Sequence, residues 1–215
     1  MDTPKQQRTF GRHRYAMLAL MLGAVVAIVT VIAILARERI VANERAWFLD
    51  RLVHLVPADL HDNDLYEDQI TVNAPDLLGV SGPTPIYRAR RAGRPTALIM
   101  TVTTREGYGG DIDLLIAVDY DGRLLGVDIL HHNETQGIGD GFAPYRSNWL
   151  RDLVGHALNN PVPKRWTIRK DGGEFEQFTG ASVTPRAILK AIRLALEYQA
   201  AHRETLFNAP STQHH

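Results

Sequence analysis

The residues best suited to chemistry lie in the segment 179–185, whose sequence is Thr-Gly-Ala-Ser-Val-Thr-Pro. Its proline predicts a helix that begins at Pro185, because proline is favoured in the first helical turn, and Thr184 is a suitable N-cap. The free N–H groups and the positive dipole end of a helix N-terminus bind phosphate. The hydroxyl of Ser182 could therefore contact a phosphate or form an ester with one. An ordinary loop before an amphipathic helix would have the same spacing, so the segment alone leaves both interpretations open.

A second loop, residues 134–140, has the sequence Glu-Thr-Gln-Gly-Ile-Gly-Asp and follows a strand that ends in His131 and His132. Two glycines around one aliphatic residue allow tight turns and the close approach of a flat ligand. A mobile connection between a strand and a helix would also explain the pattern. The histidines are not expected to chelate a metal ion, because neighbouring residues on a strand point to opposite faces. A hydrolase is also disfavoured, because no Gly-x-Ser-x-Gly elbow surrounds Ser182.

The segment 176–187 resembles the flavinylation motif of FMN-binding domains, in which a flavin transferase joins FMN through its phosphate to a hydroxyl. The motif consists of an acidic residue, two variable positions, Ser or Thr, Gly, Ala and then the acceptor Thr or Ser. The resemblance therefore implies covalent FMN, held as a phosphoester on Ser182. Glu176 stands where aspartate is usual, and serine replaces the commoner threonine acceptor but keeps its hydroxyl. The implied phosphate pocket consists of Thr179, Gly180, Ala181, Val183 and Thr184.

Two further segments are similar to the same family. Residues 134–139 resemble its Glu-Thr-Pro-Gly-Leu-Gly loop, with Gln136 in the proline position, and residues 107–110, Gly-Tyr-Gly-Gly, match a turn. Because the family places this loop against the flavin, the resemblance implies contacts with the ring or the ribityl chain from Glu134, Thr135, Ile138 and Gly139. Arg169 and Lys170 could meet the phosphate, although an exposed strand end is the simpler explanation for them.

The composition limits the possible functions. The 215 residues suffice for one domain of ordinary size and an appendage. Lys plus Arg and Asp plus Glu are both 24, so the net charge is zero, which argues against a nucleic-acid partner. Cysteine is absent, which excludes disulfides, iron–sulfur clusters and thiolate metal sites within this chain. Any redox role must therefore depend on a bound organic cofactor.

An apolar segment near the N-terminus, residues 16–36, contains no charged residue. About 20 apolar residues span a bilayer as a helix, whereas the apolar core of a cleaved signal peptide is shorter. The charges before it are predominantly positive, which places the N-terminus in the cytoplasm by the positive-inside rule. The sequence therefore predicts an uncleaved anchor with the rest of the chain outside. The charged residues in question are Asp2, Lys5, Arg8, Arg12 and Arg14.

The elements that position the two loops follow from the hydrophobic patterns, which predict an α+β fold: one transmembrane helix, then an antiparallel sheet with packed helices. Asp121-Gly122 is a hairpin signal. Strands are expected at 69–72, 86–91, 97–104, 112–120, 124–131 and 165–169. Helices are expected from the anchor to Leu55, at 149–158 and at 185–203. The expected domains are a cytoplasmic N-terminus (1–15), the transmembrane helix (16–36), a connection (37–84), the FMN-binding domain (85–206) and a disordered tail (207–215).

An anchor ahead of such a domain resembles the G subunits of Rnf electron-transport complexes. That family implies a one-electron carrier in an ion-translocating ferredoxin:NAD oxidoreductase, without an independent catalytic site. It also implies a single-pass protein of the inner membrane with a periplasmic FMN domain. The implied partners are the lipid bilayer, the other subunits and the flavin transferase. Alternatives are the paralogous C subunit of the sodium-translocating NADH:quinone reductase, whose outer domain is usually larger, a membrane-anchored flavin sensor, and a non-redox periplasmic binding module.

Overall fold

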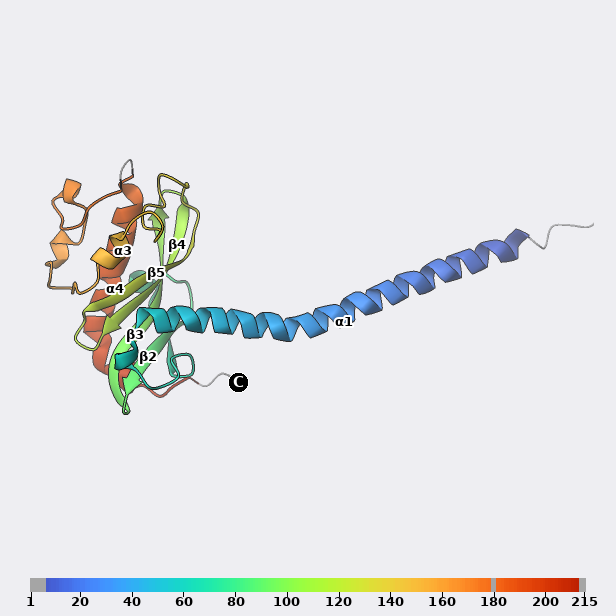
Figure 1. Cartoon of the computed structure of the whole chain (residues 1–215), viewed down its shortest axis with the longest axis horizontal. Helices are drawn as coiled ribbons and strands as arrows, with labels where there is room; N and C mark the ends of the chain where they lie inside the picture. The colour runs from blue at the N-terminus through green and yellow to red at the C-terminus, as the bar shows by residue number, and fades with distance from the viewer. Residues whose placement is uncertain (1–6, 179–180, 213–215) are drawn as a thin grey trace, which may run out of the picture. The chain divides into compact units, whose positions relative to one another are not determined.

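The computed structural model describes residues 7–178 and 181–212 (Figure 1). The chain divides into two compact units, residues 1–48 and residues 49–215. Most of helix α1 (Gln7–Leu55) belongs to the first unit, and its stretch Tyr15–Leu35 has 21 residues and a mean hydropathy of 3.0. The only hydroxyl in that stretch outside Tyr15, that of Thr30, donates to the carbonyl of Val26 at 2.8 Å. This helix is therefore long and apolar enough to anchor the protein in a membrane.

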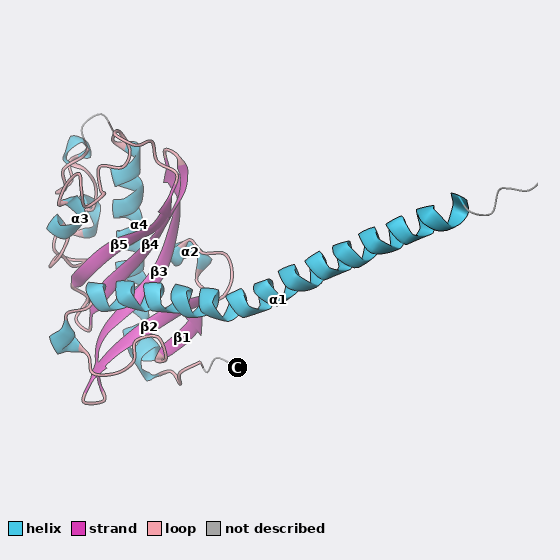
Figure 2. Cartoon of the chain, turned by 45° about the vertical axis from the view of Figure 1, so that its right-hand side comes forward, coloured by secondary structure: helices cyan, strands magenta, loops and turns pink. Residues whose placement is uncertain are grey.

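The second unit is built on a five-stranded antiparallel sheet in the order β1-β2-β3-β4-β5 (Figure 2). Each strand pairs with the next strand of the sequence, so the sheet is a meander; short turns join β2, β3, β4 and β5, and a longer connection leads from β1 to β2. The predicted α+β fold and the hairpin at Asp121-Gly122 are confirmed. The strands are β1 (Gln69–Val72), β2 (Thr84–Arg91), β3 (Arg94–Gly107), β4 (Gly110–Asp119) and β5 (Leu124–His132).

Helix α4 (Val183–Asn208) lies along one face of the sheet and closes the main hydrophobic core (Figures 1 and 2). Its buried side chains recur at helical spacing and pack against every second residue of the central strands. The other face is covered too, because Leu115 and Ala117 of β4 are fully buried outside this core. At the end of α1, Leu55 packs directly against Gly126 of β5. A Cβ added to Gly126 would lie only 2.8 Å from Cδ2 of Leu55. The core residues of α4 include Ile188, Ala191, Ile192 and Ala195.

The region between β5 and α4 differs most from the sequence-based expectations. The helix expected at 149–158 is a single turn, α3 (Trp149–Asp152), because Gly155 adopts a φ of +85° and donates its N–H to the carbonyl of Leu124 at 2.8 Å. Hydrogen bonds to β5 thus replace those of a longer helix. The strand expected at 165–169 is also wrong: 3₁₀ turns occupy Pro163–Arg165 and Arg169–Asp171. Two further short helices, at Ala58–Leu60 (3₁₀) and α2 (Pro75–Leu78), precede β2.

The compact unit is larger than the FMN-binding domain expected at 85–206. It begins at residue 49. At the other end, Phe207 is only 2 % exposed. The fully buried Arg88 of β2 donates to the hydroxyl of Ser211 at 2.6 Å, and the N–H of Thr212 donates to the carbonyl of Gln69 at 2.8 Å. The tail predicted to be disordered from residue 207 is therefore held in place up to Thr212, and residues 213–215 lie outside the described part.

Candidate functional site

Helix α4 starts at Val183, two residues before the predicted start, and Ser182 rather than Thr184 is its N-cap. Pro185 consequently occupies the third helical position. A proline is tolerated there because the first four N–H groups of a helix have no intrahelical partner, so the missing N–H costs no hydrogen bond. The shift places the proposed acceptor hydroxyl directly at the N-terminus of the helix.

The side chain of Ser182 does not form the hydrogen bond that an N-cap serine usually makes to the first helical turn. Its half-buried hydroxyl oxygen instead accepts a hydrogen bond from Nη1 of Arg186, at 3.3 Å and one helical turn further along. Among residues 7–178 and 181–212, the hydroxyl makes no other hydrogen bond, so its oxygen keeps a lone pair for reaction.

A cavity of about 340 Å³ opens beside this hydroxyl. Three segments that are far apart in the sequence line it: the turn between β3 and β4, the loop after β5, and the start of α4. The structure therefore brings together most of the residues predicted from the motifs, and it adds Tyr108, whose only sequence signal was its place in the Gly-Tyr-Gly-Gly turn. The lining residues are Tyr108, Thr135, Ile138, Gly139, Ala181, Ser182, Val183 and Thr184.

Glu134 is not part of this lining but lies beneath it, with only 6 % of its surface exposed. One carboxylate oxygen accepts the N–H of Gly109 at 3.1 Å, and the other accepts the hydroxyl of Thr184 at 2.8 Å. Thr184 itself is fully buried. A single carboxylate thus joins the loop after β5 to the β3–β4 turn and to the start of α4.

The glycines of the two loops are required by this packing. A Cβ on Gly139 would lie 2.3 Å from Oε2 of Glu134, and a Cβ on Gly109 would lie 2.1 Å from the carbonyl oxygen of Asn133. Neither glycine has a positive φ. Close approach of neighbouring groups, not backbone conformation, therefore excludes side chains at these two positions.

Asp140 fixes the far end of the loop after β5. It is 1 % exposed and accepts the N–H of Gly137 at 2.8 Å and the hydroxyl of Tyr145 at 2.9 Å. Burial raises the pKa of Asp140, but these two hydrogen bonds and the nearby charge of Arg146 outweigh it and leave the pKa below its ordinary value. The carboxylate is therefore ionised at neutral pH, and its hydrogen bonds fix the conformation of the loop.

The remaining predicted residues are not gathered at the cavity. Thr179 and Gly180 lie outside the described residues. Arg169 pairs with Glu176, and the side chain of Lys170 is exposed. The cation in contact with Ser182 is Arg186, which the motif comparison did not single out, although its spacing of four residues on a helix would have placed it on the same side.

Comparison with known proteins assigns the chain to a family. Residues 107–197 match the FMN-binding domain family. The chain is 38 % identical over 195 residues to the G subunit of the ion-translocating oxidoreductase complex of Shewanella loihica, with 91 % of each chain covered. It is 41 % identical over 171 residues to the G subunit from Shewanella amazonensis (79 % of this chain, 80 % of the relative) and 39 % over 181 residues to that from Pseudomonas aeruginosa (84 % and 85 %). The chain belongs to the family of G subunits of ion-translocating oxidoreductase complexes.

Membership of the G-subunit family confirms the resemblance drawn from the motifs and does not favour the paralogous C subunit. The region matching the FMN-binding domain contains every residue that lines the cavity. Strands β1 and β2 and the apolar stretch of α1 precede it, and the relatives' similarity extends over most of the chain. The apolar helix is consistent with a membrane-anchored subunit.

The chemistry of the cavity suits the flavin that this domain family binds. Its rim carries three exposed, largely apolar side chains, those of Tyr108, Ile138 and Val183, which offer a surface for a flat ring. The guanidinium of Arg186 contacts the hydroxyl of Ser182, and a positively charged donor beside a hydroxyl is a suitable site for a phosphate group. A second cavity of about 540 Å³ shares Ile138 with the first and extends toward Trp149.

Proposed function

We propose that this chain is a membrane-anchored electron carrier that holds FMN as a phosphoester on Ser182, within an ion-translocating oxidoreductase. The observation that carries the proposal is the position of this hydroxyl. It lies at the start of α4, makes no capping bond, and faces the cavity formed by the three segments similar to FMN-binding domains. Family membership supports the role in the complex.

Attachment is a phosphoryl transfer to the serine. The bond between Oγ of Ser182 and the phosphorus of FMN forms while the P–O bond to the leaving group of an activated donor, a flavin nucleotide phosphoanhydride, breaks. The hydroxyl proton passes to a base, and no electrons are gained or lost. A flavin transferase is the expected catalyst, because nothing in the described site supplies an activated donor. The product carries one negative charge beside the helix N-terminus, where the dipole stabilises it.

The flavin would supply the redox chemistry, and the protein would bind and orient it. Ala181, Val183 and the loop residues Thr135, Ile138 and Gly139 would surround the cofactor, and Glu134 and Thr184 would hold this surface together from below. Covalent attachment prevents loss of the cofactor. The ring would remain accessible to redox partners among the other subunits.

The anchor fixes where this chemistry takes place. The positive charges before the apolar stretch support a cytoplasmic N-terminus. The FMN domain would then lie on the periplasmic side of the inner membrane. A reporter active only in the periplasm, fused after residue 212, should be active in whole cells. Activity of a cytoplasmic reporter at the same position would contradict this orientation.

The attachment is tested by co-expressing the full-length chain with a flavin transferase. Flavin fluorescence should remain with the denatured protein on a gel, and the tryptic peptide 171–186 should gain the mass of one FMN less one water. Ser182→Ala should lose both signals, Ser182→Thr should keep them, and Ser81→Ala should match the wild type. Fragmentation must place the added mass on Ser182, because Thr179 and Thr184 lie in the same peptide. An unmodified wild-type peptide would refute the proposal.

The carrier role needs a separate measurement on the assembled complex. With Ser182→Ala, the complex should still assemble but should no longer transfer electrons between ferredoxin and NAD. Undiminished transfer in a complex that lacks this flavin would show that the cofactor serves another purpose.

A further inference from the structure

Resting on the proposed attachment at Ser182, we propose that Arg186 is a positioning residue that binds the phosphodiester, and that Asp171 holds Arg186 in the orientation this requires. Nothing in the family comparison assigns a role to either residue. The proposal depends on three contacts of one guanidinium group.

The guanidinium of Arg186 uses two of its edges. Nε and Nη2 donate to the two carboxylate oxygens of Asp171, the second at 3.0 Å, and Nη1 donates to the hydroxyl oxygen of Ser182 at 3.3 Å. A guanidinium is planar and rigid, so fixing one edge on a carboxylate fixes the direction of the remaining N–H groups. Asp171 therefore directs Nη1 to the oxygen that would carry the phosphate.

The charge balance of this contact changes on attachment. Before modification, Arg186 meets a neutral hydroxyl, a weak partner for a cation. After modification, the same oxygen belongs to a phosphodiester with one negative charge, and Nη1 lies within reach of that group. The pairing with Arg186 lowers the pKa of Asp171, so this carboxylate stays ionised and keeps its hold on the guanidinium.

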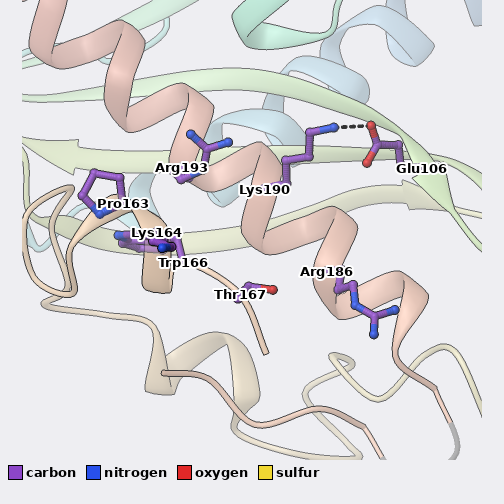
Figure 3. A pocket seen from close by; sticks show the side chains of 8 residues that line it. All are labelled: Glu106, Pro163, Lys164, Trp166, Thr167, Arg186, Lys190 and Arg193. Atoms are coloured by element: carbon purple, nitrogen blue, oxygen red, sulfur yellow. Dashed lines mark hydrogen bonds and ion pairs between the residues drawn. The ribbon is translucent and has the colours of Figure 1, made fainter. Parts of the chain in front are cut away.

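Neighbouring cations on the helix have other partners. Lys190 pairs with Glu106, and Arg193 pairs with Glu197 one turn further along α4. All three side chains line the cavity of about 470 Å³ drawn in Figure 3, in which the guanidinium of Arg186 lies apart from Lys190 and Arg193. Arg193 is therefore a suitable control, because it is an arginine on the same helix with a carboxylate partner but without contact to Ser182.

The test is the rate of covalent flavin incorporation into the full-length chain at a fixed level of transferase, followed by in-gel fluorescence and intact mass. Arg186→Gln should slow incorporation by about 10- to 100-fold, the range expected for losing a hydrogen bond to a charged group. The incorporation rate of Arg186→Lys should lie between those of Arg186→Gln and the wild type, because lysine keeps the positive charge but lacks the planar set of N–H donors of the guanidinium. Asp171→Asn should slow incorporation less than Arg186→Gln. Arg193→Gln should match the wild type.

A reversed ion pair separates phosphate binding from a purely structural role. The double variant Asp171→Arg with Arg186→Asp restores the attraction between helix and loop but puts a carboxylate beside Ser182. Its thermal stability should approach that of the wild type while its incorporation stays at least as slow as in Arg186→Gln. If the double variant regains the wild-type rate, the pair is structural and the inference is overturned.

The outcomes distinguish this inference from the proposed function. Wild-type protein without covalent flavin refutes attachment at Ser182 altogether. Wild-type protein with covalent flavin, together with equal rates in Arg186→Gln and Arg193→Gln, refutes only the role of Arg186. If Arg186→Gln fails to fold, Arg186→Lys decides the question, because a rate equal to that of the wild type would overturn the inference.

Discussion

Replacing Glu134 with alanine should weaken the fold and separate the three segments that line the cavity. The carboxylate is 6 % exposed and accepts one hydrogen bond from the N–H of Gly109 and one from the hydroxyl of Thr184. A hydrogen bond to a charged group contributes about 1.5–3 kcal/mol to stability. Because water can enter the space and partly satisfy the donors, we expect the loss of both bonds to cost about 3–5 kcal/mol in free energy of unfolding.

Glu134→Gln is the matched control, because its amide keeps the shape of the carboxylate. The amide oxygen can still accept from Gly109, and the amide nitrogen can donate to the hydroxyl of Thr184, which is both donor and acceptor. Both contacts then survive without the charge. We expect a cost of about 1 kcal/mol, the typical contribution of a neutral hydrogen bond.

The measurement is urea denaturation of the detergent-solubilised full-length variants, followed by the fluorescence of the buried Trp149 and Trp166. Covalent flavin content, measured in parallel, should fall further in Glu134→Ala than in Glu134→Gln, because the start of α4 loses its support. Equal urea midpoints for the two variants would refute the reasoning, since they would show that the carboxylate does not join the three segments.

Three further changes test other parts of the structure. Gly139→Ala should destabilise the protein by about 1–3 kcal/mol, because its Cβ would lie 2.3 Å from the carboxylate of Glu134 and the loop must shift. Asp68→Asn should lower the free energy of unfolding by about 3–5 kcal/mol at pH 7, because it leaves the buried guanidinium of Arg88 without the carboxylate that balances its charge. Deletion of residues 1–36 should release the chain from the membrane fraction, because it removes the apolar stretch.

The effect of Asp68→Asn should depend on pH. Burial raises the pKa of Asp68, but hydrogen bonds from Arg90, Arg88 and Ser211 outweigh it and leave the pKa below the ordinary value of 3.8. The stabilisation is therefore fully present above pH 3.8 and is lost as the pH falls through the folded-state pKa. The difference in urea midpoint between wild type and variant should shrink below that pH. A constant difference would contradict the assignment.

The other two changes have their own controls. Gly93→Ala places a methyl group where nothing lies within 4 Å, at a positive φ of 73° far from the cavity, so it should lower stability without lowering the flavin content of the folded protein. Wild-type stability of Gly139→Ala would show that the loop packs more loosely than described. Retention of the shortened chain in the membrane fraction would show that residues outside the apolar stretch also bind the membrane.

The sequence by itself determined the features that short stretches of chain encode. The candidate membrane-spanning helix follows from one uninterrupted apolar run, the hairpin from Asp121-Gly122, and the proposed acceptor hydroxyl from the resemblance of the segment around Ser182 to a flavinylation motif. In these cases the residues that act together are close in sequence, so their pattern can be recognised without the fold.

Only the tertiary structure decided the contacts between distant segments. Glu134 and Thr184 are 50 residues apart, and the motif comparison assigned both to the cofactor, whereas in the structure Glu134 lies beneath the cavity and accepts the hydroxyl of Thr184, which lines it. Arg88 reaches the carbonyl of Ala209, 121 residues away, and holds a tail that composition alone suggests is disordered. The start of α4 and the end of α3 differ from their predicted positions for the same reason. The ends of helices depend on hydrogen bonds to other segments, and local sequence propensity does not include these bonds.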